Sequence, residues 1–384
     1  MLVIGAGPAG TTAARFAASN GLKVLLADKK QELGAPIQCS GAVSAHALEE
    51  VQVCADPEFV QEAIFGFSIY NTTGEKTVID YRELKPEEYG TGNGRKPLGY
   101  VVDRRRFDRY LATQAERAGA EIWLKTEALG YRVLEDGYCE ADLLRFSQPV
   151  TIRAKVIIGA DGVQSQVGKW AGLKTHIKLS ELASCLQFVA DGVETNGLLE
   201  IITGHEWAPG GYAWVFPKGH GYAEIGLGIT RTFCTENAQA YLDKFINQSF
   251  LKERFKNCRI LEIQGGGVPL AAPLKTQYAD NLVLIGDAAR HVNAITGGGI
   301  HTALSSGKIA GEYLAALVKS GLPATKENLK GCQDAWLTAT GNSMWKLYHV
   351  KKKIFEVENV AERDAQLYET MAGYFSPGSE YKKI

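Results

Sequence analysis

The residues best suited to chemistry stand at the start of the chain. In Gly5-Ala6-Gly7-Pro8-Ala9-Gly10, Gly5 allows a tight turn, Gly7 lets a pyrophosphate approach the backbone, and Gly10 lets a helix pack closely on a strand. Free N–H groups and the helix dipole would hold the phosphates, and Asp28 is placed to accept hydrogen bonds from a ribose. This pattern predicts a dinucleotide-binding site.

Three elements must position this turn. Residues 2–4 are an apolar run typical of a buried strand, residues 11–20 favour a helix that Pro8 can help to begin, and residues 23–27 indicate a second strand. The βαβ context makes a purely structural turn the less favoured interpretation. Both FAD and NAD bind to such a turn, so the rest of the chain must decide between them.

The composition argues against several classes of protein. The 384 residues carry a formal net charge of −1, which gives no electrostatic basis for binding nucleic acid. No apolar segment approaches the ~20 residues of a membrane-spanning helix, and no signal-peptide pattern precedes the first strand, so we expect a cytoplasmic protein. The seven cysteines contain no C-x-x-C and the seven histidines show no close ligand spacing. We therefore expect no disulfide framework and no metal.

The first half of the chain continues the alternation of strands and helices. Residues 29–44 form a loop of small residues that contains Cys39, and Asp103 can cap a helix that begins with Arg104. The other predicted elements are a hairpin at 63–81, a loop at 83–97, a strand at 120–124, a β-meander at 127–149, a strand at 155–158 and a helix at 163–170.

The second half changes in character. Strand-like pieces between residues 184 and 270, separated by Gly, Asn or Pro turns, predict an antiparallel sheet with one helix near 235–255. A strand at 281–285 then leads into Gly286-Asp287-Ala288-Ala289 and Thr296-Gly297-Gly298-Gly299-Ile300. A helix of small residues follows at 301–318, and the remainder is mainly helical.

In this order, the motifs resemble those of the large family of FAD enzymes with the aromatic-hydroxylase type of fold. The resemblance implies an α/β fold with an α+β insertion: a Rossmann-type FAD-binding domain (1–65, 98–178, 275–318), an antiparallel-sheet substrate domain (66–97, 179–274) and a C-terminal helical region (319–384). Uncapped N–H groups at residues 298–300 would stabilise an anionic flavin. The implied cofactor-binding residues are Gly5, Gly7, Ala9, Gly10, Asp28, Cys39, Ser40, Ala42, Arg104, Ala128, Asp287, Gly298, Gly299 and Ile300.

Two further features concern a substrate. Period two on a strand places Tyr212, Trp214 and Phe216 on one face, although such an aromatic stripe is more often part of a core. Cys39 lies in a loop where something flat could approach, although a lone cysteine is more often an inert small hydrophobe.

Taken together, Y-x-W-x-F-P, the P-x-x-C loop ending at Cys39 and T-G-G-G-I resemble the geranylgeranyl reductase family. K-W-A-G-L at 169–173 and F-P-K-G at 216–219 extend the resemblance from residue 2 to about 317. It implies an FAD enzyme that saturates isolated double bonds of prenyl chains in archaeal ether lipids, with ferredoxin or NAD(P)H as electron donor. Ser40 and Ala42 stand where family members often have glycine, and Ala294 replaces a common proline.

The chemistry of an isolated alkene fits these residues. Hydride addition requires an alkene that is partly protonated, with cationic character, because no carbonyl activates it. Cys39 and the Tyr212 hydroxyl are candidate proton donors, and the substrate-facing rings of Tyr212, Trp214 and Phe216 could stabilise positive charge.

Other interpretations stay open. An aromatic-hydroxylase-type monooxygenase would need NAD(P)H and oxygen, and a non-enzymatic carrier of prenyl lipids would bind no flavin. Pyridine-nucleotide disulfide reductases are disfavoured, because a redox C-x-x-C and a second G-x-G-x-x-G are missing. A prenylated lipid substrate implies contact with the membrane surface, for which Lys351-Lys352-Lys353 is a candidate, but we favour a solvated helix face there.

Overall fold

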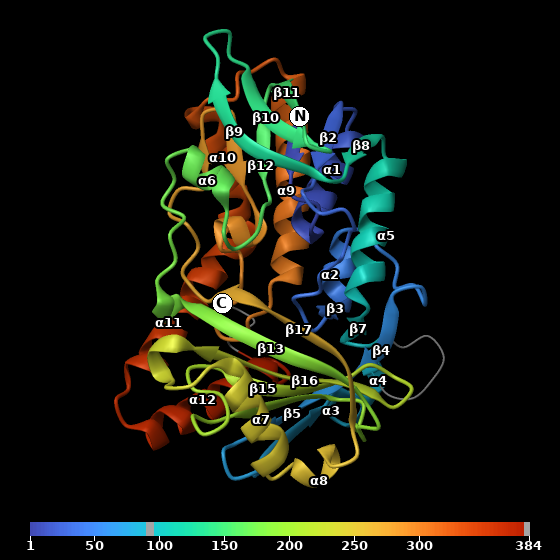
Figure 1. Ribbon diagram of the computed structural model, residues 1–384, viewed down its shortest axis with the longest axis vertical. Coiled ribbons are helices and arrows are strands. Elements are labelled where there is room, and N and C mark those ends of the chain that lie inside the picture. The colour runs from blue at the N-terminus through green and yellow to red at the C-terminus, as the bar shows by residue number, and fades with distance from the viewer. Residues whose placement is uncertain (90–95, 380–384) are drawn as a thin grey trace.

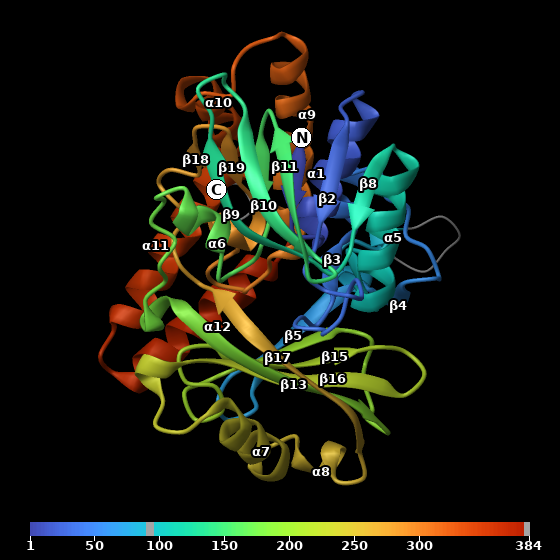
Figure 2. The ribbon, with the colours of Figure 1, turned by 45° about the horizontal axis from the view of Figure 1, so that its top comes forward.

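The chain is built around two β-sheets of different kinds, and the computed structural model describes residues 1–89 and 96–379. Figure 1 shows the first sheet in the upper half of the molecule, and Figure 2 shows the second sheet below it as a separate layer. The α/β fold with an antiparallel insertion and a helical C-terminal region is thereby confirmed.

The first sheet has six strands in the order β18-β19-β12-β1-β2-β8, and all neighbours are parallel except β18 and β19. Its strands alternate their side chains between two cores: Val3 faces the helices α1 and α9, whereas Leu2 and Ile4 face a three-stranded meander. The bounds are β1 Leu2–Ile4, β2 Val24–Ala27, β8 Ala120–Trp123, β12 Ile157–Gly159, β18 Tyr278–Ala279 and β19 Leu282–Leu284.

The helices beside this sheet begin where the sequence provides caps. The first helix begins at Pro8, three residues earlier than predicted, because Gly7 serves as its N-cap and proline fits the first turn. Asp103 accepts hydrogen bonds from the N–H groups of Arg105 and Arg106, as its predicted capping role requires. The bounds are α1 Pro8–Ser19, α5 Arg104–Arg117, α6 Gln166–Trp170 and α9 Ile300–Lys319.

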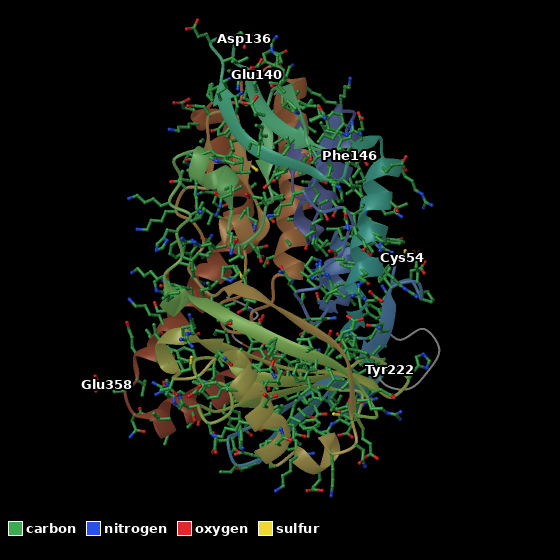
Figure 3. The ribbon with its side chains drawn as sticks, viewed as in Figure 1. Cys54, Asp136, Glu140, Phe146, Tyr222 and Glu358 are labelled. Atoms are coloured by element: carbon green, nitrogen blue, oxygen red, sulfur yellow. The ribbon has the colours of Figure 1, made fainter. Side chains whose placement is uncertain are left out.

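The predicted meander forms a three-stranded antiparallel sheet, with Asp136 and Glu140 at its outer end (Figure 3). Its strands are β9 Thr126–Val133, β10 Cys139–Arg145 and β11 Gln148–Ala154. A second small sheet has the strand order β3-β7-β4, and the short helix α2 lies between β3 and β4 in the chain. These elements are β3 Ala42–Ser44, α2 Ala45–Glu50, β4 Val60–Ile64 and β7 Gly99–Val102.

The second large sheet has seven strands in the order β17-β13-β16-β15-β14-β5-β6 and is antiparallel except for β14 and β5. One face packs on the helices α7 and α8, and the other faces α11 and α12 (Figure 2). The bounds are β5 Gly66–Tyr70, β6 Lys76–Asp80, β13 Leu182–Asp191, β14 Leu199–Thr203, β15 Tyr212–Pro217, β16 Tyr222–Thr230 and β17 Arg259–Pro269.

Three further predicted elements are organised differently in the structure. The helix expected over 235–255 is two helices, α7 (Ala238–Gln248) and α8 (Lys252–Phe255), because Ser249 adopts an extended backbone and accepts a hydrogen bond from the N–H of Leu251. The predicted hairpin begins only at Gly66, since the preceding strand β4 pairs with β7. The predicted loop at 83–97 contains the short turns α3 (Tyr81–Leu84) and α4 (Pro86–Tyr89), and its residues 90–95 lie outside the described residues.

The C-terminal region is helical, as predicted. It comprises α10 (Lys326–Trp336), a π-helical turn (Leu337–Gly341), α11 (Asn342–Glu356) and α12 (Val360–Phe375). Phe375 stacks on Phe67 of β5 with ring centroids 4.0 Å apart, so these helices cover one face of the seven-stranded sheet. Within residues 1–89 and 96–379, no helix has the length and apolar character needed to cross a bilayer.

The contact between α1 and α9 depends on glycine and generates a test. A Cβ atom at Gly307 would lie 2.4 Å from the Ala9 carbonyl oxygen, so Gly307→Ala forces the two helices apart. We expect it to destabilise the protein by about 1–3 kcal/mol, although alanine gains roughly 1 kcal/mol in helix propensity. Urea unfolding measures the change, and Gly130→Ala, whose Cβ would meet nothing within 4 Å, is the matched control. Equal midpoints for the two variants would contradict the close-packing argument.

Candidate active site

The glycine-rich turn has the geometry of a pyrophosphate site. Gly5 has φ +104°, and a Cβ at Gly10 would lie 1.9 Å from the Gly5 carbonyl oxygen, so both positions require glycine. A Cβ at Gly7 would meet nothing within 4 Å, which leaves space beside the N-terminus of α1. No side chain caps this helix end and no acidic residue stands in its first turn, so its N–H groups and positive dipole are available to an anion.

Asp28 lies directly beside this turn. Its Oδ2 accepts a hydrogen bond from the N–H of Ala6 at 2.7 Å, and its Oδ1 accepts one from the N–H of Lys30 at 2.8 Å. The backbone oxygen of Asp28 accepts from Thr126, two residues before Ala128 on β9. The glycine turn, Asp28 and Ala128 therefore form one group of predicted cofactor-binding residues.

A second group surrounds the start of α9. Gly299 is the N-cap of this 20-residue helix and offers no side chain to its free N–H groups. Asn293 holds the preceding loop, because its Oδ1 accepts hydrogen bonds from the N–H groups of Ile295 and Thr296. The N–H of Gly298 donates to the Thr296 Oγ1 at 3.2 Å, whereas Gly299 and Ile300 present backbone donors that suit an anionic ring edge or phosphate.

Two charged side chains lie near this loop. Arg104 binds Asp108 through two hydrogen bonds of 3.0 and 3.1 Å. Burial alone would lower the pKa of Arg104. The neighbouring Asp108 and Cys39 raise this pKa, so the guanidinium stays charged. Asp287 faces Gly299, where an added Cβ would lie 3.3 Å from its Oδ1. Burial raises the pKa of Asp287 to about 6, against the opposing effect of Arg104.

An internal cavity of about 870 Å³ opens beside these residues and is mostly apolar. Cys39, Ser40 and Ala42 line it together with residues 298–300. The loop of small residues and the start of α9 are far apart in sequence, but they line the same cavity. The glycine turn, Asp28, Arg104, Ala128 and Asp287 are not among the lining residues.

The predicted aromatic face also lines this cavity. Tyr212, Trp214 and Phe216 project from one side of β15, with neighbouring ring centroids 5.8 and 6.2 Å apart. Glycine on β16 makes room for them, since a Cβ at Gly226 would lie 2.6 Å from the Trp214 ring. The Tyr212 hydroxyl donates a hydrogen bond to the Thr296 carbonyl, and burial raises the pKa of Tyr212.

The cavity has lining residues that sequence reasoning missed. Cys185 of β13 pairs with Gly228 of β16, and burial raises the pKa of Cys185 to about 12, which keeps the thiol protonated. Gln187 follows on the same strand face and donates to Gln264 at 2.6 Å. Period-two alternation from Cys185 to Gln187 was the available signal, but it does not say which face of the strand meets a cavity. The labelled Cys54, in contrast, lies on the outer surface (Figure 3).

The interpretation of Lys351-Lys352-Lys353 as a solvated face is wrong for one member. Lys351 is buried and lines the cavity, whereas Lys352 and Lys353 are exposed. The reason is helical periodicity: Lys351 lies four residues after Leu347 and three before Ile354, so it falls on the buried stripe of α11.

Arg105, which follows Arg104 on α5, forms a solvent-exposed ion pair with Glu262 at 3.0 Å. Across the described residues, no cluster of His, Cys, Asp or Glu is arranged to hold a metal ion.

Comparisons with known proteins agree with this arrangement. The model of the FAD-binding domain matches residues 1–195, and that of the geranylgeranyl reductase catalytic domain matches residues 181–268. The chain is 38% identical over 345 residues to the digeranylgeranylglycerophospholipid reductase of Methanosarcina acetivorans, covering 90% of this chain and 82% of that protein. The reductase of the same name from Methanocaldococcus jannaschii is 36% identical over 369 residues, covering 95% and 88%.

Solved structures show the same relationship. A geranylgeranyl bacteriochlorophyll reductase-like protein from Thermoplasma acidophilum superposes with a TM-score of 0.84 at 30% identity, covering 100% of this chain and 97% of that one. The flavin-dependent halogenase CmlS has a TM-score of 0.71 at 16% identity, covering 100% of this chain and 66% of that one, so it shares the fold alone. From its sequence relatives and its fold, this chain belongs to the geranylgeranyl reductase family of FAD-binding proteins.

Proposed function

We propose that this protein is an FAD-dependent reductase that saturates the isolated double bonds of geranylgeranyl chains in a membrane glycerophospholipid. The observation that carries the proposal is the apolar cavity in which the Cys39 thiol, the aromatic face of β15 and the N-terminus of α9 meet. Relatives that cover most of this chain carry the name digeranylgeranylglycerophospholipid reductase, which supports this substrate class.

Two separate groups of residues would hold the two ends of an FAD molecule. We assign the ADP portion to the glycine turn, Asp28 and Ala128, and the flavin end to Cys39, Ser40, Ala42, Arg104, Asp287 and residues 298–300. When bound, FAD supplies the hydride for the alkene. The uncapped N–H groups of α9 would hold its flavin end, and the apolar walls would exclude water from the reacting atoms.

We assign the proton to Cys39. Its Sγ lies on the cavity wall, accepts a hydrogen bond from the N–H of Gly41 at 3.4 Å and is close to the Arg104 guanidinium. As hydride adds to one alkene carbon, the thiol proton adds to the other, and the neighbouring cation stabilises the thiolate that remains. After the product leaves and solvent enters the cavity, water reprotonates the thiolate. The rings of Trp214 and Phe216 stabilise the positive charge that develops on the alkene.

Tyr212 is the weaker candidate for the proton donor. Its hydroxyl donates a hydrogen bond to the Thr296 carbonyl, and burial raises its pKa. Both effects disfavour loss of the hydroxyl proton. We therefore assign Tyr212 to positioning the loop before α9 and to the aromatic wall.

The proposed reaction requires an electron donor for the flavin and access to a membrane lipid. FAD must be reduced again after each double bond, and we propose ferredoxin or NAD(P)H for this step. A lipid substrate implies peripheral contact of a cytoplasmic protein with the membrane surface. The exposed Lys352 and Lys353 on α11, the helix that also contributes to the cavity wall, support contact with anionic head groups.

The proposed activity has a direct test without oxygen. Dithionite-reduced holoenzyme should reoxidise on addition of a digeranylgeranylglyceryl phospholipid, and the mass of the lipid should increase in steps of one hydrogen pair. A monooxygenase of the aromatic-hydroxylase type would instead leave the lipid unchanged until oxygen is admitted.

Exchange of the proposed proton donor should separate the roles of Cys39 and Tyr212. We expect Cys39→Ser to lower kcat by about 10²-fold or more, because a serine hydroxyl is a much weaker acid. Tyr212→Phe, which keeps the ring, should change kcat by less than about tenfold. Single-turnover rates of FAD-replete variants measure both effects, with Cys54→Ser as the control at an exposed thiol. Full turnover by Cys39→Ser with FAD bound would rule out the thiol as donor.

Asp287 gives a prediction on pH. Its pKa in the folded protein, about 6, lies above its unfolded value near 4, so protonation favours the folded state. The contribution of this protonation to the free energy of unfolding is complete below about pH 4 and is lost as the pH rises through 6. Flavin-free Asp287→Asn should therefore melt at a higher temperature than the parent protein at pH 8, with the difference disappearing near pH 4.

The exposed Asp334→Asn is the control for this measurement. We also expect Asp287→Asn to bind FAD at least about tenfold more weakly, because a charged acceptor for the cofactor is lost. A stability difference that is the same at pH 4 and pH 8 would show that the Asp287 charge is not the cause.

A further inference from the structure

Lys351 is a buried cation in the wall of the cavity. Its side chain is only 6% exposed and lines the cavity beside Leu347, Ile354 and Phe355 of the same helix. Figures 1 and 2 place α11 on the side of the molecule away from α5 and β3, the strand that follows Cys39. Lys351 therefore lines the cavity from α11, whereas Cys39 lines it from the loop before β3.

The charge of Lys351 lacks a direct counter-ion in the described part of the chain. Its Nζ donates a hydrogen bond to the Leu270 carbonyl at 3.0 Å and lies 5.9 Å from the centroid of the Phe355 ring. No carboxylate of the described residues forms an ion pair with it, and Glu181 acts only at longer range. Burial lowers the pKa of Lys351 to about 8, with Glu181 opposing this effect, so the group is mostly charged at neutral pH.

Such a charge is unusual in this cavity. Among the lining residues that the structure describes, Lys351 is the only lysine or arginine. The other charged side chain, Glu50, belongs to α2 and lies 3.7 Å from His301, while Ser305 also donates to it at 2.8 Å. Burying an ammonium without a counter-ion is costly, whereas an anion that enters the cavity would offset that cost.

We propose that Lys351 binds the phosphate ester of the lipid substrate, while a prenyl chain extends along Trp214 and Phe216 toward Cys39. This inference rests on the proposed function, which supplies a substrate with a phosphate at one end and apolar chains at the other. Lysine binds phosphate as a point charge with rotatable donors, and Nζ has N–H groups beyond the one that Leu270 accepts. The apolar wall formed by Met344, Leu347 and Ile354 suits the chain and not the head group.

The consequence is selection for phosphorylated lipids. A neutral prenyl glycerol would leave the Lys351 charge uncompensated and would gain only the apolar contacts. A phosphate held at Lys351 would also limit how far a chain can slide past Cys39, so the head group would influence which double bonds reach it.

Binding of saturated lipids tests this site without any turnover. The probes are diphytanylglyceryl phosphate and its neutral counterpart diphytanylglycerol, titrated into FAD-replete protein in detergent and followed by tryptophan fluorescence. We expect the parent protein to bind the phosphate at least about tenfold more tightly than the neutral lipid. Lys351→Gln, which can still donate to the Leu270 carbonyl, should lose this preference, and Lys351→Arg should keep most of it.

Lys346→Gln, at an exposed position on the same helix, is the matched control and should behave as the parent protein. Equal weakening of both lipids in Lys351→Gln, or equal binding of both lipids by the parent, would overturn the proposal. Inorganic phosphate, titrated alone, should bind weakly and fail to displace the lipid; Lys351-dependent displacement at micromolar concentrations would assign the site to free phosphate instead.

The two proposals fail separately. If lipid reduction is absent while Lys351-dependent binding of diphytanylglyceryl phosphate persists, the reductase function is wrong and the anion site stands. If the parent reduces the geranylgeranyl lipid and Lys351→Gln leaves KM and kcat unchanged for phosphorylated and neutral substrates alike, only the head-group site is wrong.

Discussion

The hydrogen bond from the Tyr212 hydroxyl to the Thr296 carbonyl joins the two halves of this molecule at the point where the chemistry is proposed. Tyr212 belongs to the seven-stranded sheet, and Thr296 belongs to the loop before α9, which packs on the six-stranded side. The contact sets the aromatic face of β15 against the free N–H groups of α9. Both Tyr212 and Thr296 line the cavity, so this junction is part of its wall.

Charge is distributed unevenly around the cavity. Arg104, Asp108 and Asp287 lie close to the proposed flavin end. Arg104 and Asp108 form an ion pair there, and these charged side chains can bind polar parts of a cofactor. The middle of the cavity is apolar and aromatic, and Lys351 provides a single cation on the α11 wall. The cavity lining suits a substrate with an apolar chain and an anionic group.

Sequence reasoning succeeded where one local segment contains the whole signal. The glycine turn before α1, the single face shared by Tyr212, Trp214 and Phe216, and the cap at Asp103 each depend on spacing within a few residues. It failed where a distant segment decides the environment. Lys351 looked like part of a charged run, but Leu270 and the seven-stranded sheet bury it. Cys185 has no distinguishing signal in the sequence; the pairing of β13 with β16 places its Sγ beside Gly228, where an added Cβ would lie 3.0 Å away.

By itself, the sequence determined the class of fold, the dinucleotide turn, the family and most of the residues proposed for FAD, because glycine positions and strand periodicity are local physical requirements. Only the tertiary structure decided which of those residues share a cavity. In the structure, the cofactor-binding residues near Asp28 lie outside the cavity, whereas Cys39 and Lys351 line it. Burial and the pKa values that follow from it depend on packing between segments up to hundreds of residues apart, which no local pattern specifies.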